Sequence, residues 1–361
     1  MKKRNNGELG SFVTFKRGFD LPQQKRKEGQ VPIFSSSGIT GYHSVAVVKA
    51  PGVVTGRYGT IGEVFYATED FWPLNTTLFI ENFHGNDERF IYYFLKTIEW
   101  SKFTSASAVP GINRNSVHKE IVSFPNIETQ KKIAAILSAL DEKIAINRVI
   151  NDNLQQQAMA LYAEMFLKSS DNNVTSGTLS DIAVITMGQS PSGSSYNEDG
   201  VGEVFYQGRA EFGFRFPKRR LFTTEPKRMA ETGDVLLSVR APVGDLNIAY
   251  ERCCIGRGLG AIHSKTDHSS FVLYTMFALR SQLDVFNGEG TVFGSINRDA
   301  LNAIPIDIPP VTEIDQFEVV AHPIDELIRA NYEENCRLEA IRDSLLPKLM
   351  SGEIDVSAVQ L

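Results

Sequence analysis

Residues 127–167 read IETQKKIAAILSALDEKIAINRVINDNLQQQAMALYAEMFL, and residues 311–351 read VTEIDQFEVVAHPIDELIRANYEENCRLEAIRDSLLPKLMS. In the first stretch, mostly apolar side chains recur at alternating steps of four and three residues. This heptad spacing is typical of a helix that packs along another helix. The first seam is Ile133, Leu137, Leu140, Ile144, Asn147, Asn151, Leu154, Ala158, Leu161 and Met165. The corresponding seam of the second stretch is Phe317, Ala321, Ile324, Ile328, Asn331, Asn335, Leu338, Arg342, Leu345 and Leu349.

Two asparagines interrupt each seam at corresponding positions. Asn147 and Asn151 lie in the middle of the first, and Asn331 and Asn335 lie in the middle of the second. An asparagine in such a seam costs stability and fixes the register or the partner of the helix. We therefore expect the two helices to pair with each other through a central polar layer. Antiparallel pairing sets Asn147 against Asn335 and Asn151 against Asn331, but parallel pairing also matches asparagines, so the spacing leaves the direction open.

The segments before the two helices also resemble each other. Leu179-Ser180-Asp181-Ile182-Ala183 echoes Leu9-Gly10-Ser11-Phe12-Val13, and Ile296-Asn297-Arg298 repeats Ile112-Asn113-Arg114. Short β-rich runs, glycine-rich turns and one short helix in each half indicate mixed α/β domains. The chain is therefore a tandem duplication. Its predicted segments are a first domain at 1–125, a first helix at 126–168, a linker at 169–178, a second domain at 179–310, a second helix at 311–351 and a tail at 352–361.

Composition places the chain among ordinary globular proteins. The 361 residues are 42% hydrophobic and 22% charged, with a net charge of −6. The acidic excess is concentrated after position 309, so any nucleic-acid surface is a local face of the domains. No apolar run is long enough to cross a membrane. The three cysteines form no disulfide framework, and we expect a cytoplasmic protein.

The sequence shows no catalytic or metal-binding motif. It has no phosphate-binding Gly-x-x-x-x-Gly-Lys-Ser/Thr loop and no Asn-Pro-Pro-Tyr/Phe motif of an adenine methyltransferase. The run from Gly56 to Gly62 is glycine-rich, but its spacing predicts a hairpin turn. None of the six histidines stands at zinc-ligand spacing from a cysteine. We therefore expect a chain that is not an enzyme and binds no metal.

Several loops combine glycine with arginine and amide side chains. Arginine can bind guanine, and asparagine or glutamine can bind adenine, through paired hydrogen bonds. The candidate DNA-binding residues are Arg57, Tyr58, Asn75, Ser107, Asn113, Arg114, Gln189, Gln207, Arg209, Arg215, Arg219, Arg240, Arg257, Asn297 and Arg298. Recurrence in both halves of Arg57 as Arg240, and of Asn113 as Asn297, favours a shared role. A solvated turn remains the alternative for any single loop, and a helix or strand cap the alternative for the two asparagines.

These features together resemble the DNA-specificity subunit of type I restriction–modification enzymes. The resemblance covers nearly the whole chain. Its most specific parts are the tandem halves, Phe124-Pro125-Asn126-Ile127-Glu128-Thr129-Gln130-Lys131-Lys132-Ile133, Leu140-Asp141-Glu142-Lys143-Ile144, and the run from Leu345 to Ile354. In the first half Pro125, Gln130 and Ile133 match the family pattern, with four residues between the proline and the glutamine, whereas the stretch from Pro310 to Gln316 matches it more loosely.

The resemblance implies an α+β fold in which two target-recognition domains are each followed by a long helix. The helices would pair as an antiparallel coiled coil through Leu140, Ile144, Leu154, Ile324, Ile328, Leu338 and the four asparagines. Leu140 would then face Arg342, whose head would reach water. Each domain would read half of a bipartite, asymmetric DNA sequence.

The resemblance also implies partners. Two methyltransferase subunits would dock on the helices and supply S-adenosylmethionine chemistry, and restriction subunits could join them. The chain itself would bind no cofactor. A scaffold that binds only protein is the alternative function.

Overall fold

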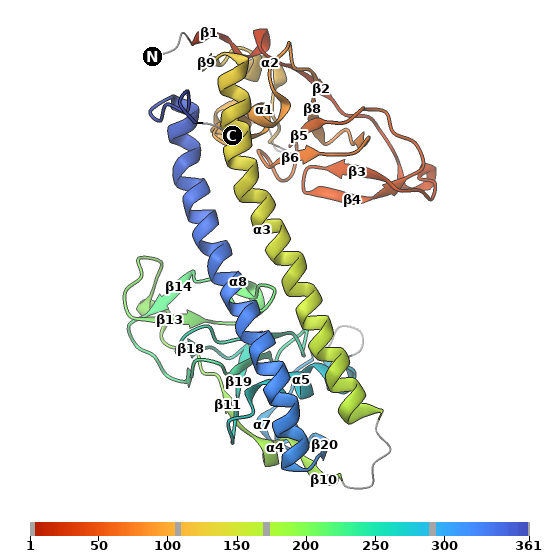
Figure 1. The fold of residues 1–361 in the computed structure, drawn as a ribbon, viewed down its shortest axis with the longest axis vertical. Helices are drawn as coiled ribbons and strands as arrows, with labels where there is room; N and C mark the ends of the chain where they lie inside the picture. Colours follow the sequence, from red (N-terminus) through yellow and green to blue (C-terminus); the bar gives the residue numbers. More distant parts are fainter. Residues whose placement is uncertain (1–3, 105–109, 169–173, 289–293, 360–361) are drawn as a thin grey trace. The chain divides into compact units, whose positions relative to one another are not determined.

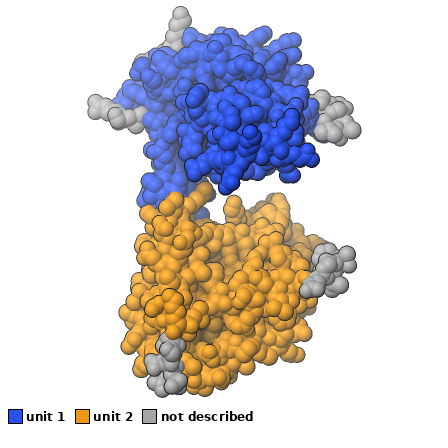
Figure 2. Space-filling model, turned by 90° about the vertical axis from the view of Figure 1, so that its right-hand side faces the viewer, with its two compact units in different colours: residues 1–147, 333–361 blue, residues 148–332 orange. Residues whose placement is uncertain are grey.

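The computed structural model describes residues 4–104, 110–168, 174–288 and 294–359. It contains two compact units, residues 1–147 with 333–361 (unit 1) and residues 148–332 (unit 2), which Figure 2 distinguishes by colour. The division falls inside both long helices, α3 (Ile127–Tyr162) and α8 (Val311–Ser351). Each unit therefore contains one part of each long helix, together with a globular part that packs on it (Figure 1).

Unit 1 is built from two small sheets and a terminal strand pair. The first sheet has the antiparallel order β2-β8-β5-β6, and the second has the order β4-β3-β7 with β3 and β7 parallel. Strand β1 pairs with β9 just before α3 begins. The elements are β1 (Asn5–Glu8), β2 (Thr14–Arg17), β3 (Val31–Ser35), β4 (Gly38–His43), β5 (Gly52–Gly56), β6 (Val64–Ala67), β7 (Trp72–Pro73), β8 (Thr77–Asn82), α1 (Glu88–Leu95), α2 (Arg114–His118) and β9 (Ile121–Phe124).

Unit 2 repeats this plan. Its first sheet has the antiparallel order β11-β19-β16-β17, its second sheet is β12-β14-β13-β18-β15, and β10 pairs with β20 just before α8 begins. The elements are β10 (Thr175–Thr178), α4 (Leu179–Ile182), β11 (Ala183–Met187), β12 (Tyr196–Asn197), β13 (Glu203–Tyr206), η6 (Arg209–Glu211), β14 (Leu221–Thr223), β15 (Met229–Ala230), β16 (Val235–Ser238), β17 (Leu246–Ile248), β18 (Cys253–Ile255), β19 (Leu259–Ser264), α5 (Ser269–Ala278), α6 (Arg280–Asp284), α7 (Arg298–Asn302) and β20 (Pro305–Ile308). The predicted duplication and the α+β class are confirmed.

The positions of these elements test two predictions, the hairpin turn from Gly56 to Gly62 and the linker at 169–178. The run from Gly56 to Gly62 connects the antiparallel strands β5 and β6, so the predicted hairpin turn is confirmed. The predicted linker at 169–178 is too long, because its last four residues form strand β10. They do so because Thr175 to Thr178 pair in register with Ile308 to Pro305. Part of the linker, residues 169–173, lies outside the described residues.

The core of unit 1 forms where helix α1 and both long helices meet the sheet. Helix α1 begins at a cap, where the Asp87 carboxylate accepts a 2.8 Å hydrogen bond from the Phe90 amide. Its buried residues pack with Ile133 from α3 and Leu349 from α8 in one cluster. Val356, beyond the end of α8, is buried in the same cluster. The segment 352–359 is thus part of the unit 1 core.

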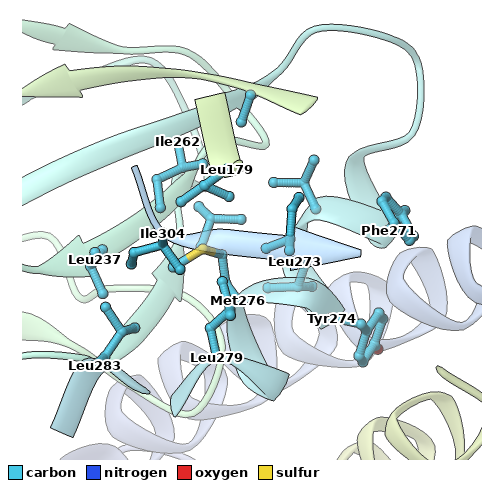
Figure 3. Packing of buried hydrophobic residues seen from close by; sticks show 14 of the residues in the cluster. Leu179, Leu237, Ile262, Phe271, Leu273, Tyr274, Met276, Leu279, Leu283 and Ile304 are labelled. Carbon is cyan, nitrogen blue, oxygen red and sulfur yellow. The ribbon is translucent and has the colours of Figure 1, made fainter. Parts of the chain in front are cut away.

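Helix α5 lies at the centre of the unit 2 core. Its residues from Ser270 to Met276 are all buried, because the sheet covers one side of α5 and the long helices cover another. Figure 3 shows Leu237 and Ile262 of the sheet together with Leu273 and Met276 of α5. A helix that is apolar all round is the expected sequence for such an enclosed position.

The long helices follow the heptad spacing closely. No seam position of either helix is exposed. The second helix covers the predicted range 311–351, and the first gives way at Tyr162 to a π-helical turn, Ala163–Leu167. We expected the Arg342 head to reach water beside Leu140. Instead, its guanidinium donates hydrogen bonds to Asp141 (2.7 Å) and Asp343 (2.9 Å).

The seam asparagines form two hydrogen-bonded pairs, one in each unit. In unit 1, the Asn147 amide donates to the Asn335 side-chain oxygen at 2.9 Å. In unit 2, the Asn331 amide donates to the Asn151 side-chain oxygen at 2.8 Å, and Asn151 donates to the Ile328 carbonyl oxygen at 3.2 Å. Asn147 and Asn151 are buried, so these bonds give their side-chain nitrogens partners where water cannot reach them. Within unit 1, Asp141 of α3 meets Arg342 of α8, and the later Asn147 meets the earlier Asn335. The two helix segments of this unit therefore run antiparallel.

Candidate nucleic-acid interface

A polar hollow of about 500 Å³ lies in unit 1 at the end of strand β5. It is lined by Arg17, Arg57, Tyr58, Leu78, Gly111, Ile112, Asn113, Arg114 and Asn115. Two backbone hydrogen bonds hold Arg57 in place, since its amide donates to the Thr76 carbonyl oxygen (2.8 Å), just before β8, and its carbonyl oxygen accepts from the Ile112 amide (3.0 Å), in the segment before α2. A Cβ on Gly111 would stand 2.2 Å from the Tyr58 ring, so glycine is required for this ring to lie against the backbone.

A second hollow, of about 750 Å³, lies in unit 2 at the end of strand β16. It is lined by Met187, Gly188, Val239, Arg240, Ala241, Arg257, Gly294, Ser295, Ile296 and Asn297. The wall is joined by backbone hydrogen bonds from Ala241 to Gly294 (3.0 Å) and from Ile296 to Val239 (3.1 Å). The Arg257 backbone amide donates to the Ser190 hydroxyl at 3.2 Å, and the Arg257 side chain is exposed.

The two hollows occupy equivalent places in the duplicated plan. In each unit the hollow lies where the inner strand of the first sheet ends and the segment before the short helix α2 or α7 crosses it. Arg57 and Arg240 follow the inner strands β5 and β16. The pairs Tyr58–Gly111 and Arg240–Ser295 form equivalent isolated bridges between the two segments. The residues that recur in the sequence of both halves therefore also occupy equivalent places in the two units.

Several arginines in and next to the hollows have no carboxylate partner in the part of the chain that the structure describes. Among the described residues, no carboxylate lies within 4.0 Å of the guanidinium groups of Arg57, Arg114, Arg240, Arg257 or Arg298. The Arg57 guanidinium lies over the Tyr58 ring, 4.5 Å from its centroid, a cation–π contact that orients it without using its N–H donors. Such donors suit phosphate oxygens and the acceptor edge of guanine.

Asn113 and Asn297 have the capping role that the sequence left open. The Asn113 side-chain oxygen accepts from the Asn115 amide at 3.0 Å, and that of Asn297 accepts from the Ala300 amide at 2.8 Å. Both residues are N-caps of short helices. Their oxygens are engaged with the backbone, whereas the paired contact to adenine uses both the oxygen and the nitrogen of the amide. The geometry supports capping, which places Arg114 and Arg298 at the next position.

Three other predicted residues hold acidic partners. Arg209 pairs with Asp245, Arg219 pairs with Glu251, and the Asn75 amide donates to Asp20. The two exposed ion pairs are weak, so Arg209 and Arg219 can exchange one partner for another. Gln189 and Gln207 have exposed side chains outside the lining of the unit 2 hollow. Ser107 lies outside the described residues.

The assignment of Arg215 as a DNA-binding residue is wrong. Its side chain is only 3% exposed and stands 3.2 Å from the Asp325 carboxylate inside unit 2. A buried guanidinium cannot reach a duplex in this conformation. The sequence did not reveal the burial, because Arg215 lies among Lys218, Arg219 and Arg220 in a run with the composition of an exposed basic loop.

Arg17 is a lining residue that the sequence analysis missed. It is exposed at the end of β2, opposite Leu78 of β8, and faces the same hollow as Arg57. The signal was present, since Gly18 follows Arg17 as Gly188 follows Met187 and both stand equally far from the echoed residues Leu9 and Leu179. Aligning those glycines would have placed Arg17 beside the unit 2 hollow residue Met187.

The described residues offer neither a membrane-spanning helix nor a metal-binding cluster. No helix in the described ranges is both long and apolar enough to span a membrane. No group of three or more histidine, cysteine, aspartate or glutamate side chains in those ranges is placed to hold a metal ion.

Comparison with known proteins connects this architecture to one family. A family model described as the type I restriction modification DNA specificity domain matches residues 1–156 and 172–335. A Methanocaldococcus jannaschii protein named as the MjaX type I restriction enzyme specificity subunit is 31% identical over 307 residues, which cover 78% of this chain and 72% of that one. The MjaIX specificity subunit of the same organism is 23% identical over 397 residues, covering 94% and 91%.

A solved structure has the same fold. The crystal structure of the type I restriction–modification S subunit from M. genitalium aligns with a TM-score of 0.64, at 18% sequence identity, over 97% of this chain and 96% of that one. At this identity the likeness concerns the fold alone.

Proposed function

Because the chain belongs to the type I restriction–modification DNA specificity family, we propose that its two hollows face duplex DNA and that each unit reads one half of a bipartite, asymmetric target. The chain is a specificity subunit with two DNA-recognition domains. The observation that carries the proposal is the equivalent placement of Arg57 and Arg240, each at the end of an inner strand with its guanidinium free of a carboxylate among the described residues.

Charge and geometry support this use of the hollows. The net charge of −6 gives no general attraction for DNA, so affinity must come from local cations. Backbone hydrogen bonds fix the positions from which Arg57 and Arg240 extend, which favours readout of defined atoms over diffuse attraction. The lining residues differ between the units, Tyr58 in one and Ala241 in the other, so the two half-sites would differ in sequence.

The long helices would serve the assembly. Two methyltransferase subunits would dock on α3 and α8, bind S-adenosylmethionine and methylate adenine, while this chain supplies no catalytic group. Restriction subunits would join such a complex. The absence of a methyltransferase motif from the sequence and the extent of exposed helix surface support this division of labour. We place the complex in the cytoplasm, where its DNA is found and where free cysteines such as Cys253 are stable.

Methylation mapping tests the proposal. Cells that express this chain with its methyltransferase subunits are expected to carry methylated adenine in one bipartite motif. Replacing residues 1–125 by the corresponding domain of another specificity subunit should change one half of that motif and leave the other. A change in both halves, or in neither, would refute the modular reading.

Salt dependence separates DNA reading from a purely protein-binding scaffold. The complex should bind a duplex carrying the mapped motif with an affinity that falls steeply as salt rises, because each phosphate contact releases counterions. A duplex with both half-sites scrambled is the matched control. Failure to bind either duplex would favour the scaffold, whereas equal and salt-dependent binding of both would show DNA binding without readout of the half-sites.

A further inference from the structure

Each unit contains a tyrosine–aspartate pair that joins a short helix to a long one. In unit 1, the Tyr93 hydroxyl of α1 donates to the Asp141 carboxylate of α3 at 2.7 Å. In unit 2, the Tyr274 hydroxyl of α5 donates to the Asp325 carboxylate of α8 at 2.8 Å. Both tyrosines are the sixth residue of their helix. The pair is therefore a duplicated feature of the scaffold.

The arginine that joins each pair comes from a different place. In unit 1 it is Arg342, whose guanidinium donates to Asp141 at 2.7 Å and which extends from the other long helix, α8. In unit 2 it is Arg215, which lies in the segment between η6 and β14. Its Nη1 stands 3.2 Å from Asp325, and its Nη2 donates to the Tyr274 hydroxyl at 3.3 Å. In unit 1 the arginine beside the tyrosine–aspartate pair thus joins the two long helices, whereas in unit 2 the arginine in this place attaches a loop to α8.

The Arg215 side chain is buried at the edge of the unit 2 core. Its guanidinium lies 5.7 Å from the ring centroid of Tyr274 and 5.6 Å from that of Phe277, at the side of the core cluster where Figure 3 shows Tyr274. Burial raises the pKa of the Asp325 carboxyl, and the nearby Arg215 charge opposes that rise. Since a buried charge without its partner is strongly destabilising, neither side chain can leave this position cheaply.

The neighbouring residue provides a second attachment to α8. The Phe216 ring packs against Tyr332 of α8, with centroids 4.9 Å apart, and against Tyr250 at 5.6 Å. Tyr250 and Tyr332 also pack on each other at 5.5 Å. The Arg329 guanidinium of α8 lies 4.7 Å from the Tyr250 centroid. Adjacent residues of one loop are therefore both anchored on the same helix.

Backbone hydrogen bonds hold the loop that contains Arg215 and Phe216 in a closed turn. The Lys218 amide donates to the Glu211 carbonyl oxygen at 2.8 Å, and the Arg215 carbonyl oxygen accepts from Ile248 of β17 at 2.8 Å. Arg209 on one side and Arg219 on the other are exposed. The centre of the segment is thus anchored on α8, and Arg209 and Arg219 extend from its flanks, where each pairs with an acidic side chain of unit 2.

We propose that Arg215 and Phe216 are positioning residues that mount the segment 207–220 of unit 2 on helix α8, so that reading of the second half-site depends on side chains that never touch DNA. This inference rests on the proposed function. It assigns the segment 207–220 to recognition of the half-site that unit 2 reads. The Gln207 carbonyl oxygen, at the start of this segment, accepts a 3.1 Å hydrogen bond from the amide of Gly258, the residue after the hollow's Arg257. Unit 1 has no counterpart among the described residues, since its equivalent arginine, Arg342, comes from α8.

The test compares half-site discrimination in the full complex with its methyltransferase subunits. The probes are duplexes carrying the mapped target, the target with the first half scrambled, and the target with the second half scrambled. Arg215→Met should lower the discrimination ratio for the second half-site by about tenfold and leave the ratio for the first unchanged, because misplacing a contact costs about as much as one mismatched base pair. Arg215→Lys, which keeps the buried charge, should recover part of the loss.

Two further variants serve as a control and as a milder test of the same attachment. Arg342→Met makes the same substitution in the equivalent position of unit 1 and should leave both ratios at the wild-type value. If Arg215→Met does not fold, Phe216→Leu removes the second attachment more mildly and should lower the same ratio. Wild-type discrimination of the second half-site in either folded unit 2 variant would overturn the inference while leaving the proposed function intact. Failure of the wild-type complex to discriminate either half would instead refute the proposed function.

Discussion

The Asn147 side-chain amide donates a 2.9 Å hydrogen bond to the side-chain oxygen of Asn335 in the middle of two otherwise apolar seams. The same Asn147 nitrogen lies 2.7 Å from a Glu334 carboxylate oxygen, and Asn147 is fully buried. Its own side-chain oxygen has no hydrogen-bond partner among the described residues. The contact therefore fixes which residues meet without being an optimal source of stability, which is the usual role of a seam asparagine.

Removing one member of this pair should cost more than removing both. Asn147→Leu leaves the Asn335 amide without its partner, and we expect a loss of about 1–3 kcal/mol in the free energy of unfolding of unit 1. The double variant Asn147→Leu/Asn335→Leu should recover most of that loss, because two apolar side chains then meet. Urea denaturation of the wild type, both single variants and the double variant completes the cycle. Additive losses would show that the two side chains do not interact.

Arg57→Ala and Arg240→Ala should each weaken recognition of a different half-site. Each removes a guanidinium that the structure leaves without a carboxylate among the described residues, and we expect a loss of about 1–3 kcal/mol in binding to the mapped target. Scrambling the corresponding half-site should then have less effect than it has on the wild type. Lys102→Ala, which removes an exposed cation paired with Glu99, serves as the control. If both arginine variants affected the same half-site, the assignment of one half-site to each unit would be wrong.

Gly111→Ala should disturb the unit 1 hollow without unfolding the unit. The added methyl group would stand 2.2 Å from the Tyr58 ring, so the ring and the Arg57 guanidinium above it must move. Binding measured by fluorescence anisotropy should weaken about tenfold or more, since a displaced contact loses roughly the energy of one base readout. Gly193→Ala is the matched control because a Cβ there meets no atom within 4 Å. Equal affinities of the two variants would show that the Tyr58 ring position is irrelevant to binding.

The cysteines should differ sharply in reactivity. Cys336 is exposed, whereas burial raises the pKa of the Cys253 thiol to about 12, with nearby acidic groups adding to the rise. At pH 8 the Cys253 thiolate is therefore scarce as well as enclosed, and the thiolate is the reactive form. Mass spectrometry after brief iodoacetamide treatment should find Cys336 modified and Cys253 intact, and a Cys336→Ser variant should show almost no modification. Rapid labelling of Cys253 in the folded chain would contradict the buried position.

The sequence anticipated the scaffold well and the interface only in part. The heptad seam and the echo of Ile112-Asn113-Arg114 at Ile296-Asn297-Arg298 are covalent facts that persist in any conformation. Arg215 shows the limit, because a basic loop and a buried anchor have the same local composition. Arg17 shows the converse, since its place beside Arg57 arises from pairing of β2 with β8 and not from nearness in the chain.

By itself, the sequence determined that the chain is duplicated and that two long helices carry matching apolar and asparagine positions, because periodicity is a property of local chemistry. Only the tertiary structure decided which arginines remain available. Burial and ion pairing depend on residues far away in sequence, as Asp325 shows by lying beside Arg215 and Asp141 by lying beside Arg342. The duplicated aspartates are visible in the sequence, but the arginine that each one receives is chosen by the fold.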